Sequence, residues 1–270
     1  MLLSLAQPGF GGPKVTVGRT VAAAESVSLD QIDHRVWDAL LTRYVDDRGN
    51  VAYAAWKASA QDVQALDTYL ATLSTADPRR QTSKNAVLAF WINAYNAVTV
   101  RGILREYPTS SIRNHTAKLI GYNIWKDLLL VVGGQPYSLD QMEHEVLRKL
   151  GEPRIHFAIV CASRSCPRLM NRAYTAADLE NQLATNTKAF FADPANFRHE
   201  AAGRVFRLSS ILSWFGDDFG SDQASRLRAI APYLPTREAY QAALGNAVTV
   251  SYLDYDWGLN DQTAAQSGRR

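Results

Sequence analysis

A chain of 270 residues, of which 47% are hydrophobic and 20% charged, is typical of an ordinary soluble globular protein with a substantial core. Lys and Arg outnumber Asp and Glu by only 29 to 26 and form no long basic run, so the sequence does not predict a nucleic-acid partner. No window contains eighteen uninterrupted apolar residues, which excludes a transmembrane segment on length.

The two ends of the chain are expected to lie outside the folded part. Residues 1–28 combine a short apolar start, a Pro/Gly break and a run of small residues, which predicts a flexible tail. Residues 29–261 are then expected to form one domain, followed by a second flexible tail at 262–270. The N-terminal segment lacks the charged start and long apolar run of a secretory signal, so the sequence does not determine the cellular compartment of the protein.

Apolar residues at spacings of three and four predict helices over residues 29–44, 59–73 and 83–108. The third has Ser83 as a candidate N-cap and Pro108 as a stop. It is apolar on almost every face, which predicts a core helix whose polar residues find buried partners.

Shorter elements follow. The Gly133-Gly134 pair between two β-prone runs predicts a hairpin, and residues 138–151 predict a helix that stops at Gly151. The apolar run at 154–161 predicts a core strand, and a helix with Thr175 as N-cap is expected next. Short elements at 204–219 and 226–234 precede a last strand within 247–261. This order favours an α+β fold, with helices packed on a mostly antiparallel sheet.

The two cysteines, Cys161 and Cys166, flank a Ser/Arg-rich turn after the apolar run. A catalytic thiol, a zinc site completed by histidines, a disulfide and a packed strand end all remain open as interpretations. The spacing of the cysteines differs from that of common zinc sites, and a disulfide across so short a loop would add little stability. Nearby arginines would lower the pKa of a thiol, which makes an activated cysteine the leading hypothesis.

In this hypothesis either cysteine is the nucleophile, and His156 or His144 is the general base. The base is oriented by Asp256 or Glu143, and backbone N–H groups of the ASRSC turn offer an oxyanion site. Polar and aromatic residues near these positions are expected to bind the substrate: Asn93, Tyr95, Asn96, Arg164, Ser165 and Trp257. The first three are expected either to line the pocket or to hold the groups that line it. No cofactor or metal ion is required, although zinc-dependent activity is a third interpretation.

Four ordered blocks, AFWINAYNA, SLDQMEHEVLR, RIHFAIVCASRSCPRL and YLDYDWGLN, resemble the bacterial branch of the DUF547 family, a domain of unknown function. The resemblance runs from about Trp37 to Asn260. Bacterial members often look exported or lipid-anchored, so it favours an exported address over a cytoplasmic one. In plant-type relatives serine usually stands at the position of Cys166. If the whole family shares one chemistry, this implies that Cys161 is the reactive thiol; if only bacterial members share it, Cys166 is.

The order of elements also resembles the papain and transglutaminase superfamily. That resemblance implies a core helix packed on a sheet, with His156 as the strand histidine and Asp256 as its partner. The cysteine expected at the start of the helix is missing, and Asn85 and Asn93 stand there instead.

Two functions follow from these residues. The first is a thiol-dependent hydrolase or acyl transferase that acts on an amide, a peptide or a thiol compound. The second is a non-catalytic ligand-binding or interaction module, in which the same polar residues shape a pocket for a small molecule or peptide.

Overall fold

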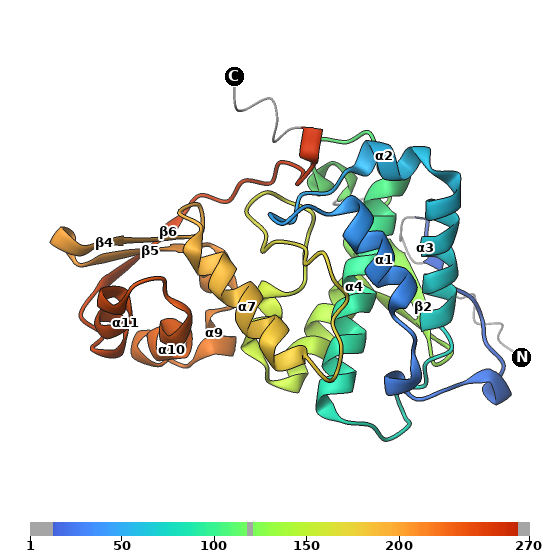
Figure 1. Cartoon of the computed structure of the whole chain (residues 1–270), viewed down its shortest axis with the longest axis horizontal. Coiled ribbons are helices and arrows are strands. Elements are labelled where there is room, and N and C mark those ends of the chain that lie inside the picture. Colours follow the sequence, from blue (N-terminus) through green and yellow to red (C-terminus); the bar gives the residue numbers. More distant parts are fainter. Residues whose placement is uncertain (1–12, 118–120, 264–270) are drawn as a thin grey trace, which may run out of the picture.

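The computed structural model describes residues 13–117 and 121–263 and combines helices with short strands (Figure 1). The helices are α1 (Arg35–Tyr44), α2 (Tyr53–Ala58), α3 (Ala60–Leu73), α4 (Lys84–Glu106), α5 (Ile124–Asp127), α6 (Leu139–Gln141), α7 (Leu179–Ala192), α8 (Ile211–Trp214), α9 (Gly216–Phe219), α10 (Gln223–Ile230) and α11 (Arg237–Leu244). The strands are β1 (Val15–Val17), β2 (Leu128–Val132), β3 (Gln135–Ser138), β4 (Phe197–Glu200), β5 (Val205–Ser209) and β6 (Thr249–Leu253). The predicted α+β class is confirmed.

The strands of the described ranges form two small sheets in place of a single, mostly antiparallel one. The strand order is β1-β2-β3 in one sheet and β4-β5-β6 in the other, and each sheet has one parallel and one antiparallel pair. The predicted hairpin is confirmed as β2 and β3. Its turn residues, Gly133 and Gly134, have φ angles of 58° and 78°, which suit a two-residue hairpin turn.

The first sheet begins earlier in the chain than the sequence predicts. Val15–Val17 lie within the predicted flexible tail but form β1, which pairs with β2. A strand of three residues is too short to show a clear alternation of apolar and polar residues, so the sequence pattern does not reveal it. Residues 1–12 and 264–270 of the two predicted tails lie outside the described residues.

Helix α4 is the core helix that its sequence predicts. The Ser83 hydroxyl accepts a hydrogen bond from the Ala86 N–H (3.2 Å), and the helix ends at Glu106, with Tyr107 as its C-cap just before Pro108. Within the described chain, α4 is long and apolar enough to cross a membrane by length and composition, but 89% of this apolar window is buried inside the protein. Its apolar faces are therefore covered by the rest of the fold.

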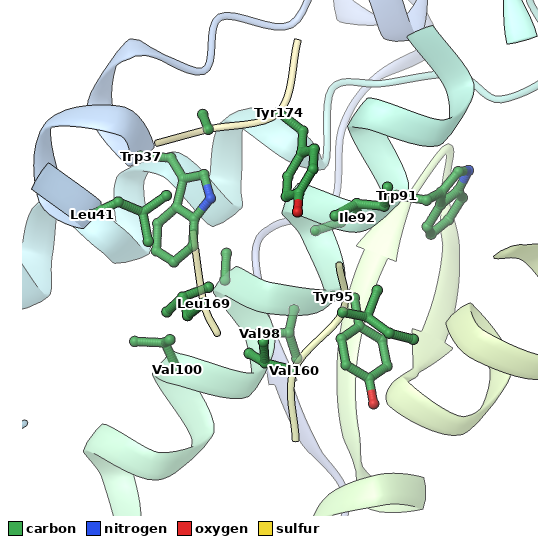
Figure 2. Close-up of a cluster of buried hydrophobic side chains, with 14 of the residues drawn as sticks. Trp37, Leu41, Trp91, Ile92, Tyr95, Val98, Val100, Val160, Leu169 and Tyr174 are labelled. Atoms are coloured by element: carbon green, nitrogen blue, oxygen red, sulfur yellow. The ribbon is translucent and has the colours of Figure 1, made fainter. Parts of the chain in front are cut away.

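The packing around α4 draws on distant parts of the sequence. Figure 2 shows side chains of α1, α4 and the segment at 158–174 in one cluster, including Trp37, Val98, Leu169 and Tyr174. Each of these four side chains is at most 2% exposed. Burying an apolar side chain contributes about 1.5–3 kcal/mol, so this cluster fixes the segment that carries both cysteines against α4.

The segment Arg154–Cys161 is not the predicted core strand. Pro153–Phe157 form a 3₁₀ helix, and the residues that follow run beside α4 without a strand partner. The Asn96 side chain accepts from the Val160 N–H (2.9 Å) and donates to the Ala158 carbonyl (3.0 Å). A helix side chain thus satisfies backbone groups that a sheet would otherwise pair, and the apolar run is buried against α4 instead.

Two predicted helices also have different limits. The helix expected from Thr175 begins at Leu179, because the Thr175 hydroxyl accepts from the Asp178 N–H (3.3 Å) in a turn that precedes the helix. The segment 138–151 starts as α6, continues as a π-helix at Met142–Leu147 and ends in a 3₁₀ turn. A π-helix is rare and frequently marks a functional site.

A second apolar cluster surrounds the sheet β4-β5-β6 and receives side chains from α7 to α11. Phe157 belongs to this second cluster, whereas Ile155 and Ile159 belong to the cluster around α4. The short segment 155–159, which includes the end of the 3₁₀ helix, therefore joins the two clusters. The single domain expected over 29–261 stays a prediction.

Candidate thiol site

A cleft of about 200 Å³ opens where the two apolar clusters meet. Predicted site residues from separate parts of the chain line it: Tyr95, Glu143, His144, His156, Cys161, Cys166 and Trp257. Residues that the sequence analysis missed complete its wall: Trp125, Asp140, Ile159, Pro167, Ile211, Trp214, Phe215 and Tyr255. An apolar cleft with a few converging polar groups is typical of a small-molecule site.

Two buried asparagines of α4 hold the cysteine segment in place. Asn93 donates to the Tyr174 carbonyl (2.8 Å) and accepts from the Tyr174 N–H (2.9 Å). Asn96, one turn further along, holds Ala158 and Val160 in the same manner. Both asparagines are at most 1% exposed, and neither lines the cleft. They do not line the cleft but hold the segment that forms its wall, which is one of the two places expected for them.

The turn between the cysteines is fixed by the C-terminal segment. Ala162 has a left-handed φ of 57°, which reverses the chain. The Arg164 N–H then donates to the Gly258 carbonyl (2.8 Å), and the Ser165 N–H donates to the Asp256 carbonyl (3.2 Å). The Ser165 hydroxyl accepts in return from the Asp256 N–H (2.8 Å). The side chain of Ser165 therefore anchors this turn, and it does not line the cleft.

Three backbone N–H groups of this turn are not available for the expected oxyanion site. The N–H groups of Arg164 and Ser165 are used by the C-terminal segment, and the Cys166 N–H donates to the Ser163 carbonyl (3.2 Å). The Cys161 N–H donates to the Cys166 sulfur (2.9 Å). Because the turn needs these donors for its own shape, they are not free to bind a developing negative charge.

The sulfur of Cys166 is the centre of a hydrogen-bond network. It accepts from the Cys161 N–H (2.9 Å) and the Tyr255 hydroxyl (3.3 Å), and it lies 2.6 Å from the Cys161 sulfur. Burial raises the pKa of the Cys166 thiol, but the hydrogen bonds from Cys161 and Tyr255 stabilise the thiolate more and lower the pKa to about 6. The thiolate is thus favoured by direct donors to sulfur.

Cys161 favours the neutral thiol over the thiolate. Burial raises the pKa of the Cys161 thiol well above its ordinary value, and the hydrogen bond with Cys166 and its negative charge raise it further. The Cys161 sulfur also lies 3.0 Å from the Ser163 hydroxyl and 3.2 Å from the Tyr255 hydroxyl. Both cysteines are free thiols. Cys166 is therefore the cysteine whose thiolate form is populated near neutral pH.

His156 is paired with Asp218. Its Nε2 lies 2.7 Å from Asp218 Oδ2, and its ring stacks on Phe215 with centroids 4.2 Å apart. Burial lowers the pKa of His156, and the bond to Asp218 offsets this only in part. The Arg148 guanidinium, which donates to both Asp218 oxygens, holds the pKa of that carboxyl below its ordinary value. A neutral imidazole then donates from Nε2 and keeps Nδ1 as an acceptor.

The predicted pairing of His156 with Asp256 is therefore wrong. The Asp256 carboxylate accepts from the Gly258 N–H (2.8 Å) and lies 3.4 Å from the Arg164 guanidinium, and its side chain is 53% exposed. The sequence analysis passed over Asp218 within a short element. Its one signal is a pair of acidic residues between two aromatic ones, WFGDDF, in a segment otherwise apolar enough to be buried.

Glu143 faces the cleft from the π-helix. Its Oε2 accepts from the Tyr95 hydroxyl (3.1 Å), which projects from α4. Burial raises the pKa of Glu143. The nearby His144 and the hydrogen bond from Tyr95 lower it by less, so the pKa lies above its ordinary value. The adjacent His144 accepts from the Arg148 guanidinium at Nδ1 (3.1 Å) and lines the same cleft. The cleft thus contains a carboxyl group whose pKa lies above its ordinary value.

Aromatic side chains form the mouth of the cleft. The ring of Tyr255 lies 4.8 Å from that of Trp214 and 4.6 Å from that of Trp257. Trp214 is 48% exposed, an unusual position for so large an apolar side chain. An exposed indole beside a cleft is suited to contact a ligand.

No group of three or more His, Cys, Asp or Glu side chains is arranged to hold a metal ion within residues 13–117 and 121–263. A zinc site built on both cysteines and both histidines is therefore not formed there.

These features define an α+β protein with a thiol pair, one buried and one half-buried, on the wall of an aromatic cleft. Residues 79–191 match the model of the family described as "Protein of unknown function, DUF547". The matched segment contains α4, both cysteines, Glu143 and His156, and the resemblance found in the sequence is confirmed there. No curated protein and no solved structure matches the chain. The likeness to the bacterial branch and to papain-type folds stays a prediction.

Proposed function

We propose that this protein is a cysteine-dependent hydrolase or acyl transferase in which Cys166 is the nucleophile. The observation that supports it is the set of hydrogen bonds that Cys166 accepts from Cys161 and Tyr255, at a sulfur on the wall of a cleft. The thiolate is the form of cysteine that attacks an acyl carbon, and these donors stabilise it.

The proposed reaction uses Glu143 as its acid. The Cys166 thiolate attacks the acyl carbon of an amide or thioester, the S–C bond forms, and the bond to the leaving group breaks. The leaving group takes a proton from Glu143, a carboxyl group on the same cleft whose pKa is raised by burial. Water then attacks the thioester, gives a proton back to Glu143 and releases the thiolate. In a transferase an acceptor amine replaces water, and in both cases His156 accepts a hydrogen bond from the attacking molecule at Nδ1.

The test is the pH dependence of iodoacetamide labelling, with mass spectrometry to locate the adduct. Cys166 is expected to be labelled with an apparent pKa of about 6, and Cys161 is expected to resist labelling at neutral pH. Cys166→Ser should abolish the rapid labelling by iodoacetamide near pH 6. As a matched control, Cys161→Ser should leave Cys166 reactive with a pKa that is higher, because the neighbouring thiol is lost. Labelling of both cysteines only near their ordinary pKa of about 8.5 would overturn the proposal.

A second candidate, a non-catalytic ligand-binding module, is favoured by one observation. The backbone N–H groups of Arg164, Ser165 and Cys166 are all used within the protein, so these three donors are not available for the electrostatic stabilisation of acyl transfer. In this function the aromatic residues at the mouth would bind a small molecule or peptide without chemistry. It predicts that Cys166→Ser binds the same ligands as the unmodified protein, whereas the enzyme hypothesis predicts loss of turnover on amides and thioesters.

A further inference from the structure

A second cleft, of about 450 Å³, reaches Cys166 from outside the thiol cleft. We call it the arginine cleft, and its charged wall consists of Arg48, Arg164, Arg168, Asp47 and Asp193. Cys166 is the residue that the two clefts share. A molecule bound at the thiol therefore has an aromatic cleft on one side and a charged one on the other.

The charges of the arginine cleft favour an anion. Its three guanidinium groups face two carboxylates, which leaves one positive charge. The carboxylates have their own donors: Asp47 accepts from the Asn171 amide (3.1 Å), and Asp193 accepts from the Ala195 N–H (2.8 Å). Among the described residues, Arg48 and Arg168 have no carboxylate within ion-pair distance.

Among the residues that the structure describes, Arg164 has one ion pair, a weak 3.4 Å contact with Asp256 in which both side chains are about half exposed. An exposed pair of this kind contributes little and is readily replaced by another anion. All three arginines of the cleft are therefore available to a ligand.

Arg168 is held ready for such a ligand. Its Nε donates to the Asn186 side chain (2.7 Å), and its Nη1 donates to the Asp47 carbonyl (3.2 Å). Asn186 is 1% exposed and is fixed in turn by its bond to the Phe157 carbonyl (2.6 Å). These bonds fix the plane of the guanidinium and leave Nη2 without a protein partner in the described chain. A planar, oriented guanidinium suits a carboxylate.

We propose that the substrate is an acyl compound with a carboxylate, which binds the arginine cleft while the acyl carbon lies at Cys166. This inference rests on the proposed function and names its substrate class. A single net positive charge matches one carboxylate better than a dianion such as phosphate. An apolar or aromatic portion of the same substrate then occupies the thiol cleft.

The test compares two alkylating reagents that differ in charge, iodoacetate and iodoacetamide, at Cys166 in the full chain. The ratio of their rate constants is compared with that of N-acetylcysteine amide in the same buffer. We expect the protein ratio to exceed the reference about 3- to 10-fold and to fall in 0.5 M NaCl, because exposed charges are screened. Arg168→Gln should lower the ratio about 2- to 5-fold. Arg172→Gln, a control on the same segment that pairs with Asp38, should leave it unchanged.

The outcomes separate the two proposals. A ratio equal to the reference, with rapid iodoacetamide labelling, overturns the carboxylate inference and leaves the thiol proposal standing. If Cys166 resists both reagents, the thiol proposal fails, and the arginine cleft is tested by ¹⁵N NMR of the arginine Nε–H groups. Saturating shifts of Arg48, Arg164 and Arg168 with N-acetylglycinate, but not with its neutral amide, would support the carboxylate site. Equal shifts with both compounds, or none, would overturn it.

Discussion

Replacing Tyr255 with Phe should reduce the acidity of Cys166 without altering the shape of the cleft. The change removes one hydroxyl, which donates to the Cys166 sulfur at 3.3 Å, and keeps the ring that packs between Trp214 and Trp257. A hydrogen bond to a charged group contributes about 1.5–3 kcal/mol, and one pKa unit corresponds to about 1.4 kcal/mol. The pKa of Cys166 should therefore rise from about 6 to about 7–8.

The assay is the rate of iodoacetamide labelling at Cys166 as a function of pH. At pH 6 about half of the wild-type thiol is ionised, so the variant should be labelled roughly 5- to 50-fold more slowly there. At pH 9 the two proteins should react at similar rates, because Cys166 is largely ionised in both. Trp214→Phe, which alters a neighbour of the Tyr255 ring that does not contact the sulfur, is the matched control. An unchanged pH profile in Tyr255→Phe would refute the network as the source of the low pKa.

Three further changes test other parts of the structure. Asn96→Leu should cost roughly 2–5 kcal/mol in urea unfolding, because it leaves two buried backbone groups without partners, and a loss below about 1 kcal/mol would contradict this. Asp218→Asn should lower the pKa of His156 further in an NMR titration, because the charge of Asp218 raises it, whereas the exposed Asp217→Asn should not; a rise would contradict the pairing. Burial lowers the pKa of His34 from 6.5 to about 4, so its contribution to stability is complete above about pH 6.5 and is lost as the pH falls towards 4. Between pH 6.5 and 4 the unfolding free energy of His34→Gln should therefore fall by roughly 2–3 kcal/mol less than that of the wild-type protein. An equal fall in both proteins would argue against a buried neutral His34.

Local features of the sequence correctly predicted several elements because each depends on neighbouring residues. Ser83 and Pro108 mark the ends of α4, and the pair Gly133-Gly134 marks the hairpin turn. The prediction of a strand before Cys161 was wrong for a physical reason. An apolar run has the same composition whether it is buried by a sheet or by a helix, and here Asn96 of α4 supplies the hydrogen bonds that a neighbouring strand would have made.

The core helix, the α+β class and the two cysteines in a turn could be predicted from the sequence alone, because caps, periodicity and glycine positions act over a few residues. The groups that meet at the site could not, because they come together only in the folded chain. Tyr255 contacts Cys166 across 89 residues, and Asp218 contacts His156 across 62. Contacts over such separations leave no periodic trace in the sequence. The acidity of Cys166 follows from the folded arrangement of donors around its sulfur, in which Cys161 and Tyr255 lower the pKa of the thiol.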